Sequence, residues 1–257
     1  MQKTADLLFE LRRTNTTLPD LPAALKPTTE AEAYRTQDAL VKQLTNLYDS
    51  QRIGYKVGCT SQGAQTLLNT DGPLFGHMLS SHHFRSPATL DTLNYSMIVI
   101  EPEFGFRIGK DVPQDDYDAT SIQPFMASVI PSIEVVHHRL GSWDKFNAPI
   151  TIADNAIHGC WVQGEEETTW QQVDYQRHEV KLYVDDELTT TGRAELALGS
   201  PLNVLAWLAT TLPKHGHTLK QNDLVTTGVC MDVFIAHAGQ KLRADFGLLG
   251  EVHIDLI

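Results

Sequence analysis

SMIVIEPEFGFRIG, residues 96–109, alternates strictly between two sets of side chains, as an extended β-strand does. One set is apolar, whereas the other contains two carboxylates, Glu101 and Glu103. On one face of a strand, their Cα atoms lie roughly 6.5–7 Å apart. The apolar face consists of Ile98, Ile100, Pro102, Phe104, Phe106 and Ile108, and the opposite face of Val99, Glu101, Glu103, Gly105 and Arg107.

Two carboxylates this close repel each other when buried, so such a strand needs a cation nearby. Glu134, in the second apolar run PSIEVV (131–136), supplies a third carboxylate, and three carboxylates suit a hard divalent cation. The alternative is the solvated face of an antiparallel sheet, which alternates in the same way. Val99 on the glutamate face, and Ile133 and Val135 beside Glu134, favour a buried setting. The spacing alone leaves both interpretations open.

Length and composition narrow the class of protein. The chain has 257 residues, 42% of them hydrophobic and 20% charged, which is ordinary for a single globular unit with a sizeable core. The net charge of −12 argues against a nucleic-acid partner, because phosphate binding needs a basic patch. We expect no membrane partner, since no apolar run approaches the roughly 18 residues of a membrane helix and the N-terminus lacks a signal peptide's features. Three scattered cysteines, Cys59, Cys160 and Cys230, indicate reduced thiols in a cytoplasmic protein.

The order of expected elements indicates a β-dominated core with helices before and across it. This order disfavours a regular βαβ alternation. The expected helices are 2–15, about 28–48 with a capping box from Thr29 to Glu32, 120–129, and 200–212 with Ser200 as its cap; the expected strands include 53–58, 96–109 and a hairpin over 178–192 that turns at Asp185-Asp186.

Lys56 stands in the middle of the strand over 53–58, where an exposed lysine is the common outcome. Beside a metal-bound enolate, its pKa would be depressed and it could act as an acid or base. Thr226-Thr227-Gly228 ends a strand and could present a hydroxyl or N–H group to an anion, whereas Asp154-Asn155 could simply shape a turn. His137 and His138 could be ligands, although satisfied histidines are commoner. A glycine-rich phosphate loop and a serine nucleophile elbow are both missing.

Several motifs together resemble the fumarylacetoacetate hydrolase superfamily, in particular its branch of 2-keto-4-pentenoate hydratases and 4-oxalocrotonate decarboxylases. The match runs from about residue 50 to the C-terminus, and the N-terminal helices also suit that branch. Each motif is weak alone, but their order and spacing are specific. They are YKVG (55–58), IEPEFGF (100–106), PSIEVV (131–136), ADNA (153–156), LGSPLNVLAWLA (198–209) and NDLVTTG (222–228) with a later AG turn.

The resemblance implies an α+β fold, a mixed β-sandwich roll preceded by N-terminal helices. We expect residues 1–50 to form the helical segment and 51–257 the catalytic domain, as one continuous structural unit. It further implies Mg²⁺ or Mn²⁺ held by Glu101, Glu103 and Glu134, with Lys56 as catalytic acid or base. The expected partner is a small 2-oxo acid, and the expected state is a cytoplasmic homo-oligomer, with a related pathway enzyme as a further candidate partner.

The implied activity is that of a divalent-metal-dependent lyase, which hydrates an unsaturated 2-oxo or 2-enol acid. Substrate contacts are expected at Thr227, Asp154 and Ile157, although many relatives carry serine where this chain has Ile157. The alternatives are a 4-oxalocrotonate-type decarboxylase and an acylpyruvate-type C–C bond hydrolase, which would need a His–Glu pair with His82 or His83 as donor. A non-catalytic partner subunit is the third alternative.

Overall fold

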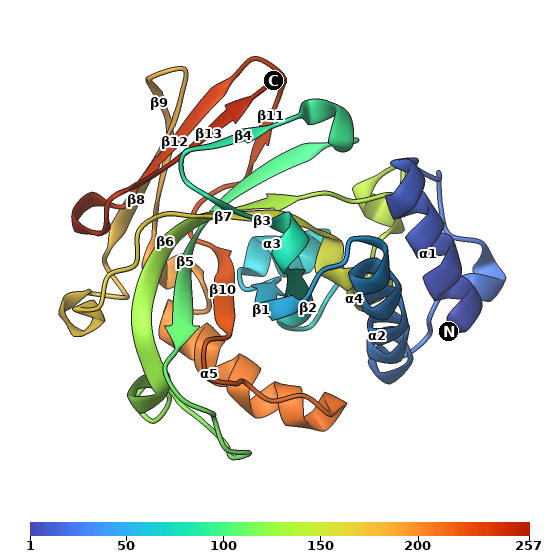
Figure 1. The fold of residues 1–257 in the computed structure, drawn as a ribbon, viewed down its shortest axis with the longest axis horizontal. Coiled ribbons are helices and arrows are strands. Elements are labelled where there is room, and N and C mark those ends of the chain that lie inside the picture. The colour runs from blue at the N-terminus through green and yellow to red at the C-terminus, as the bar shows by residue number, and fades with distance from the viewer.

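Two mixed β-sheets form the body of the chain in the computed structural model, which describes all of residues 1–257 (Figure 1). The larger sheet has the order β2 (Leu74–Leu79), β1 (Arg52–Gly58), β10 (Leu224–Val229), β5 (Ile98–Ile108), β6 (Met126–Val136), β7 (His158–Gln163) and β3 (His83–Arg85), with β11 (Phe234–Ala236) also paired to β5. The smaller sheet has the order β4 (Ala88–Leu90), β13 (Glu251–Leu256), β12 (Lys241–Asp245), β8 (Glu179–Val184) and β9 (Glu187–Arg193). The pairs β1–β10, β3–β7 and β4–β13 are parallel, and the others are antiparallel.

Strands β5 and β6 are the longest, with 11 residues each, and curve side by side through the larger sheet (Figure 1). The two faces expected of β5 are confirmed. Phe104, Phe106 and Ile108 are fully buried in the hydrophobic core. The register sets Glu101 directly opposite Glu134, and because opposite residues of an antiparallel pair point to the same face, their side chains meet.

The helices are α1 (Gln2–Thr14), α2 (Glu30–Leu47), α3 (Gln62–Leu67), α4 (Ala148–Ala153) and α5 (Pro201–Thr211). Capping residues start two of them as expected: the Thr29 hydroxyl accepts from the Glu32 N–H, and the Ser200 hydroxyl from the Leu202 N–H. In Figure 1, α2 packs against both α1 and α4, and these helices lie at one side of the sheets. Their Leu8 and Leu40 belong to the same hydrophobic cluster as the strands, so the helical segment shares the main core. The division near residue 50 stays a prediction.

The helix expected over 120–129 is wrong. Only a short 3₁₀ turn, Gln123–Phe125, is present, and β6 begins at Met126. Pro124 stands within that turn, and the β-branched run from Val129 onward suits a strand that is buried on both faces. The hairpin expected over 178–192 is confirmed, with Asp185 and Asp186 both at positive φ as a tight turn requires.

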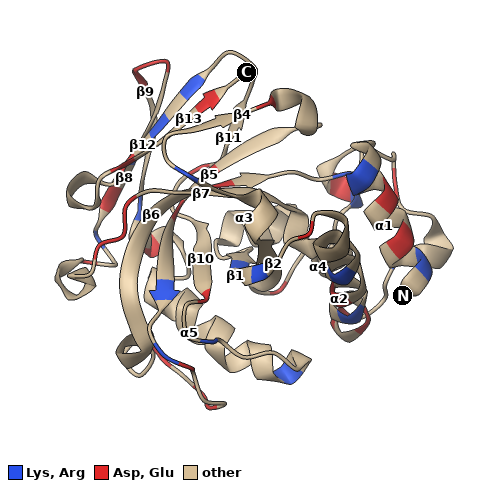
Figure 2. Cartoon of the chain, in the orientation of Figure 1, with Lys and Arg blue, Asp and Glu red and all other residues tan.

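The helix expected over 200–212 belongs to a longer apolar stretch than the sequence pattern indicated. Ala194–His215, which contains α5, reaches the length and mean hydropathy (1.2) of a membrane-spanning helix. Its Val204, Leu205 and Leu208 are fully buried in the protein core, which accounts for its apolar character. Lysines and arginines are scattered among acidic residues over both sheets and the helices (Figure 2).

Candidate active site

Three carboxylates converge on one face of the larger sheet. Oxygen atoms of Glu101, Glu103 and Glu134 all lie within 4.8 Å of one another. Glu103 and Glu134 have no solvent-exposed surface, and Glu101 is partly exposed. The setting is therefore the buried one, and repulsion between the three charges must be offset locally.

Glu103 is held in place by strand β10, which lies next to β5. Its Oε2 accepts hydrogen bonds from the Thr226 hydroxyl and, at 2.9 Å, from the Gly228 N–H. The pairing of β10 with β5 shifts between Thr226 and Val229, where Gly228 has a φ of 86°. A Cβ at residue 228 would lie 2.0 Å from Thr60 Oγ1, so this bulge requires glycine. Glu103 Oε1 is buried and has no hydrogen-bond partner.

On the other side, Glu134 is fixed by two groups. Its Oε1 lies 2.8 Å from His158 Nδ1, and because a carboxylate only accepts, that nitrogen carries the proton. Its Oε2 lies 3.1 Å from Lys56 Nζ. Lys56 is buried and also donates to the Ala156 carbonyl at 3.1 Å. Five neighbouring strands, β1, β10, β5, β6 and β7, thus contribute one polar cluster.

The carboxylates differ in protonation because their surroundings differ. Burial, reinforced by neighbouring carboxylates, raises the pKa of Glu101 to about 7 and holds that of Glu103 well above its usual range. Burial acts in the same direction on Glu134, but Lys56 and His158 outweigh it and lower the pKa of Glu134. Burial lowers the pKa of Lys56, yet the three carboxylates outweigh this and raise it. The depressed pKa expected for Lys56 would therefore require a bound cation, whose positive charge would offset the effect of the three carboxylates on the lysine.

This cluster fits a divalent cation. The buried Glu103 Oε1 lacks a partner, and two of the three carboxylates favour protonation for want of positive charge. Carboxylate oxygens alone form the donor set, which suits a hard ion such as Mg²⁺ or Mn²⁺. Glu101, Glu103 and Glu134 are the residues that would hold it.

A strained turn faces the cluster. Asn155, Ala156 and Ile157 have φ values of 53°, 51° and 52°, a left-handed run that costs non-glycine residues about 1–2 kcal/mol each. The Asn155 amide holds the turn by bonding both the N–H and the carbonyl of His77. Arg12 also fixes the turn, because its guanidinium donates hydrogen bonds to the carboxylate and the backbone carbonyl of Asp154. The strain is tolerated where it points the Ala156 carbonyl at Lys56.

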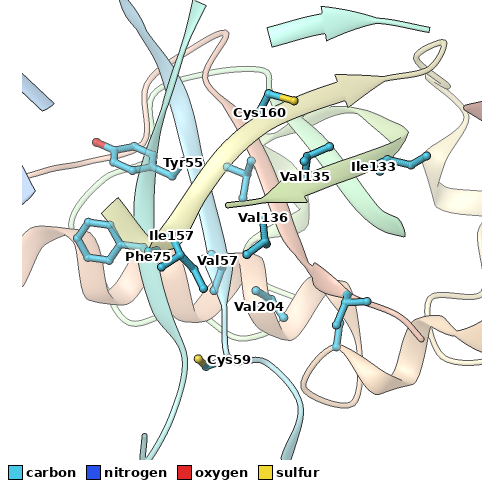
Figure 3. Packing of buried hydrophobic residues seen from close by; sticks show 14 of the residues in the cluster. Tyr55, Val57, Cys59, Phe75, Ile133, Val135, Val136, Ile157, Cys160 and Val204 are labelled. Atoms are coloured by element: carbon cyan, nitrogen blue, oxygen red, sulfur yellow. The ribbon is translucent and has the colours of Figure 1, made fainter. Parts of the chain in front are cut away.

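A cavity of about 220 Å³ opens beside the carboxylates. Eleven of its fifteen lining residues are apolar, and the other four are Ser61, Gly63, Glu101 and Asp232. No lysine, arginine or histidine lines it. Ile157 and Val136 line the cavity and pack in the same hydrophobic cluster as Val57 (Figure 3).

No family model matches the chain. A 2-hydroxypent-2,4-dienoate hydratase of Pseudomonas putida is 33% identical over 168 residues, which are 64% of this chain and 74% of that protein. The chain belongs to the 2-keto-4-pentenoate hydratase branch of the fumarylacetoacetate hydrolase superfamily. The relationship to the hydratase branch extends over nearly the whole chain. A 2-keto-4-pentenoate hydratase of Paraburkholderia xenovorans (strain LB400) is 25% identical over 255 residues, 99% of this chain and 94% of that protein.

A solved structure shares the complete fold of this hydratase-branch chain. It is the 4-oxalocrotonate decarboxylase from Pseudomonas putida G7 complexed with magnesium and adipate, with a TM-score of 0.93 and 20% identity over 100% of this chain and 97% of that one. The family resemblance and the α+β roll expected from the sequence are confirmed.

The structure separates the positions at which substrate contacts were expected. Ile157 lines the cavity, but Asp154 and Thr227 do not. The Asp154 carboxylate pairs with Arg12 at 2.8 Å, and the Thr227 hydroxyl donates to the Phe104 carbonyl at 2.7 Å. The anion expected at the end of β10 is instead the Glu103 carboxylate, which accepts hydrogen bonds from the Thr226 hydroxyl and the Gly228 N–H. We therefore leave Asp154 and Thr227 out of the proposed substrate site of this hydratase-branch chain.

The histidines considered as possible ligands or donors lie away from the carboxylates. His137 bonds Ser96 and Arg139, and His138 packs against Trp143 and Phe146, so neither reaches the carboxylates. His83 bonds Gln163, and His82 lies in a separate cleft beside Arg12. The histidine that sequence reasoning missed is His158. Its one signal was its place two residues after the ADNA motif.

Proposed function

We propose that this chain is a divalent-metal-dependent lyase that hydrates an unsaturated 2-oxo or 2-enol acid, as 2-keto-4-pentenoate hydratases do. The observation that carries the proposal is the converging trio of carboxylates, two of them fully buried, with Lys56 beside them and an apolar cavity that lacks any cationic side chain. The names of the relatives support the reaction class. We also propose a homo-oligomer, since the apolar residues Leu67, Val233 and Ile235 at the cavity are about half exposed. A cytoplasmic location is proposed because all three cysteines are free thiols.

The cavity favours a substrate with one carboxylate. A second carboxylate at the far end of the substrate would lie among apolar side chains, with Glu101 and Asp232 as the charged lining residues. An unpaired buried charge is costly, so a dicarboxylate such as 4-oxalocrotonate is disfavoured. Hydration of 2-hydroxypenta-2,4-dienoate is therefore preferred to decarboxylation.

In the proposed mechanism, Glu101, Glu103 and Glu134 would hold the cation and Lys56 would transfer a proton. When bound, Mg²⁺ or Mn²⁺ would anchor the substrate's carboxylate and 2-oxygen and draw electron density toward them. Lys56 is oriented by Glu134 and the Ala156 carbonyl, and it would carry the proton lost from the enol oxygen to the terminal carbon. Water then adds across the remaining double bond. With carbons counted from the carboxylate carbon, its hydroxyl goes to C4 and its proton to C3, which gives a 4-hydroxy-2-oxo acid.

The other candidates find less support. An acylpyruvate-type hydrolase needs a His–Glu pair that activates water at the substrate. His158 instead donates to the proposed metal ligand Glu134, and no histidine lines the cavity. A non-catalytic partner subunit has no need for three converging, mutually repelling carboxylates, whose arrangement costs stability unless a cation binds.

The decisive assay supplies the purified chain and Mg²⁺ with 2-hydroxypenta-2,4-dienoate, 4-oxalocrotonate and an acylpyruvate in turn. We expect loss of the dienoate with formation of 4-hydroxy-2-oxopentanoate, and a kcat/KM at least about 10-fold lower for the dicarboxylate. Release of CO₂ from 4-oxalocrotonate at a comparable kcat/KM would instead identify a decarboxylase. Inactivity with all three substrates would favour the partner subunit.

Replacing His158 by phenylalanine tests how Glu134 is positioned. Phenylalanine keeps a buried ring but cannot donate to Glu134 Oε1, and loss of such a partner typically weakens metal binding about 10–100-fold. The measurement is the Mg²⁺ dissociation constant by titration calorimetry. His83→Phe serves as the matched control, since that ring bonds Gln163 instead. An unchanged dissociation constant in His158→Phe would remove His158 from the site.

Metal removal should destabilise the protein in a pH-dependent way. Because the pKa of Glu101 is raised to about 7, the folded state binds its proton more tightly than the unfolded state does. The stability that this provides is fully present below the unfolded pKa of about 4.5 and is lost as the pH rises through about 7. With chelator, Tm should therefore fall by several degrees across neutral pH, and saturating Mg²⁺ or Glu101→Gln should reduce the fall. Equal pH slopes in all three samples would contradict this electrostatic account.

A further inference from the structure

A second cluster of potential ligands lies away from the carboxylates. Asp38 comes from α2, His77 from β2, and His217 from the loop that follows α5. His77 pairs with Tyr55 across β1 and β2, whereas Lys56 pairs with Gly76. Because successive strand residues point to opposite faces, this cluster lies on the face of the sheet opposite Lys56.

The distances within the cluster suit a shared ion. Asp38 Oδ1 lies 3.1 Å from His217 Nε2 and 3.4 Å from His77 Nε2. Two ligand atoms bound at about 2.0–2.1 Å to a tetrahedral ion are separated by roughly these distances. The rings of His77 and His217 are edge-to-face with centroids 5.0 Å apart, so their Nε2 atoms approach Asp38 from different directions.

A hydrogen bond explains only part of this arrangement. His217 bonds Asp38, but His77 is 3% exposed and neither of its ring nitrogens has a hydrogen-bond partner. A buried imidazole without partners is expensive, and most such groups in native proteins are satisfied. His77 Nε2 lies 3.4 Å from Asp38 Oδ1 without forming a hydrogen bond, and at this separation both atoms can bind one ion.

We propose that Asp38, His77 and His217 form a second metal site, for a borderline divalent cation of the Zn²⁺ class. Two imidazole nitrogens and one carboxylate oxygen are a donor set that zinc accepts and that hard Mg²⁺ or Ca²⁺ does not favour. The side chains of Asp38 and His217 are 43% and 26% exposed, so an ion can enter from solvent and water can complete its coordination.

The site joins three segments that are distant in sequence. Zn²⁺ there ties helix α2 to β2 and to the loop before β10. It also steadies residue 77, whose backbone clamps the Asn155 amide and thus the strained turn beside Lys56. The role is structural and does not depend on the proposed hydratase activity.

The test counts Zn²⁺ on the full-length protein, which is stripped with chelator, saturated with millimolar Mg²⁺ and titrated against a chromophoric zinc indicator. We expect the wild type to bind one more Zn²⁺ per chain than His217→Ala or Asp38→Asn, whatever ion the glutamate site holds. A hundredfold excess of Zn²⁺ over its Kd should raise the wild-type Tm by roughly 5–10 °C, and this shift should be lost in both variants.

His237→Ala is the matched control, because His237 is exposed and belongs to neither cluster. It should keep the wild-type zinc count. Equal zinc counts in wild type and His217→Ala would overturn the second site, as would a wild type that binds no Zn²⁺ beyond that of the glutamate site. Zinc counting requires no substrate, so failure here is distinguishable from failure of the hydratase proposal.

Discussion

Glu103→Ala is expected to remove measurable turnover and most bound metal. Glu103 is fully buried, with one oxygen fixed by Thr226 and Gly228 and the other free for a cation. Loss of a group that merely supports a metal ligand already costs about 10–100-fold, so loss of a ligand itself should lower kcat/KM by more than about 100-fold. Turnover and metal content per chain, measured on the same preparation, check this expectation.

Two further variants make this result interpretable. Glu103→Gln keeps the shape and the hydrogen-bonding reach of the side chain, so it separates loss of charge from misfolding and should lose metal equally. Glu179→Ala removes an exposed strand glutamate of β8 and should leave both readouts unchanged. Wild-type turnover and metal content in Glu103→Ala would refute the assignment.

Lys56→Met should lower kcat by about 10²–10⁴-fold, the usual contribution of a positioned acid or base. Methionine keeps the length of the side chain but carries no proton. Removing the ammonium next to Glu134 takes a competing positive charge away from the carboxylates, so metal binding should be retained or strengthened. This split between turnover and metal content distinguishes Lys56 from the three glutamates.

Parallel measurements of kcat and the Mg²⁺ dissociation constant provide the check, with Lys181→Met as the control because Lys181 is a partly exposed residue of β8. If Lys56→Met lost turnover only in proportion to lost metal, Lys56 would be an electrostatic support for the cation. If turnover stayed at the wild-type level, Lys56 would have no part in the reaction.

The carboxylate strand was predictable because its signal is local. A period of two over 96–109 assigns Glu101 and Glu103 to one face without knowledge of any other segment. Glu134 was found because a charged residue within PSIEVV conflicts with its surroundings, and such conflicts mark functional positions. The register that sets Glu134 opposite Glu101 comes from the tertiary fold.

Contacts between segments that are far apart in the sequence could not be predicted from local sequence patterns. Arg12 meets Asp154 across 142 positions, and nothing near either residue indicates the other. His158 approaches Glu134 only because β7 pairs with β6, and the left-handed run that ends at Ile157 has no glycine to signal it. The helix expected over 120–129 fails for a related reason, because the sheet recruits Met126 and the residues that follow it into β6.

Anomalous diffraction from crystals of the chain grown with Mn²⁺ tests the central claim most directly. The account predicts a peak at coordinating distance from oxygens of Glu101, Glu103 and Glu134, and its loss from crystals of Glu103→Gln. Well-ordered crystals at saturating Mn²⁺ with no peak between these carboxylates, or a peak that persists unchanged in Glu103→Gln, would contradict it.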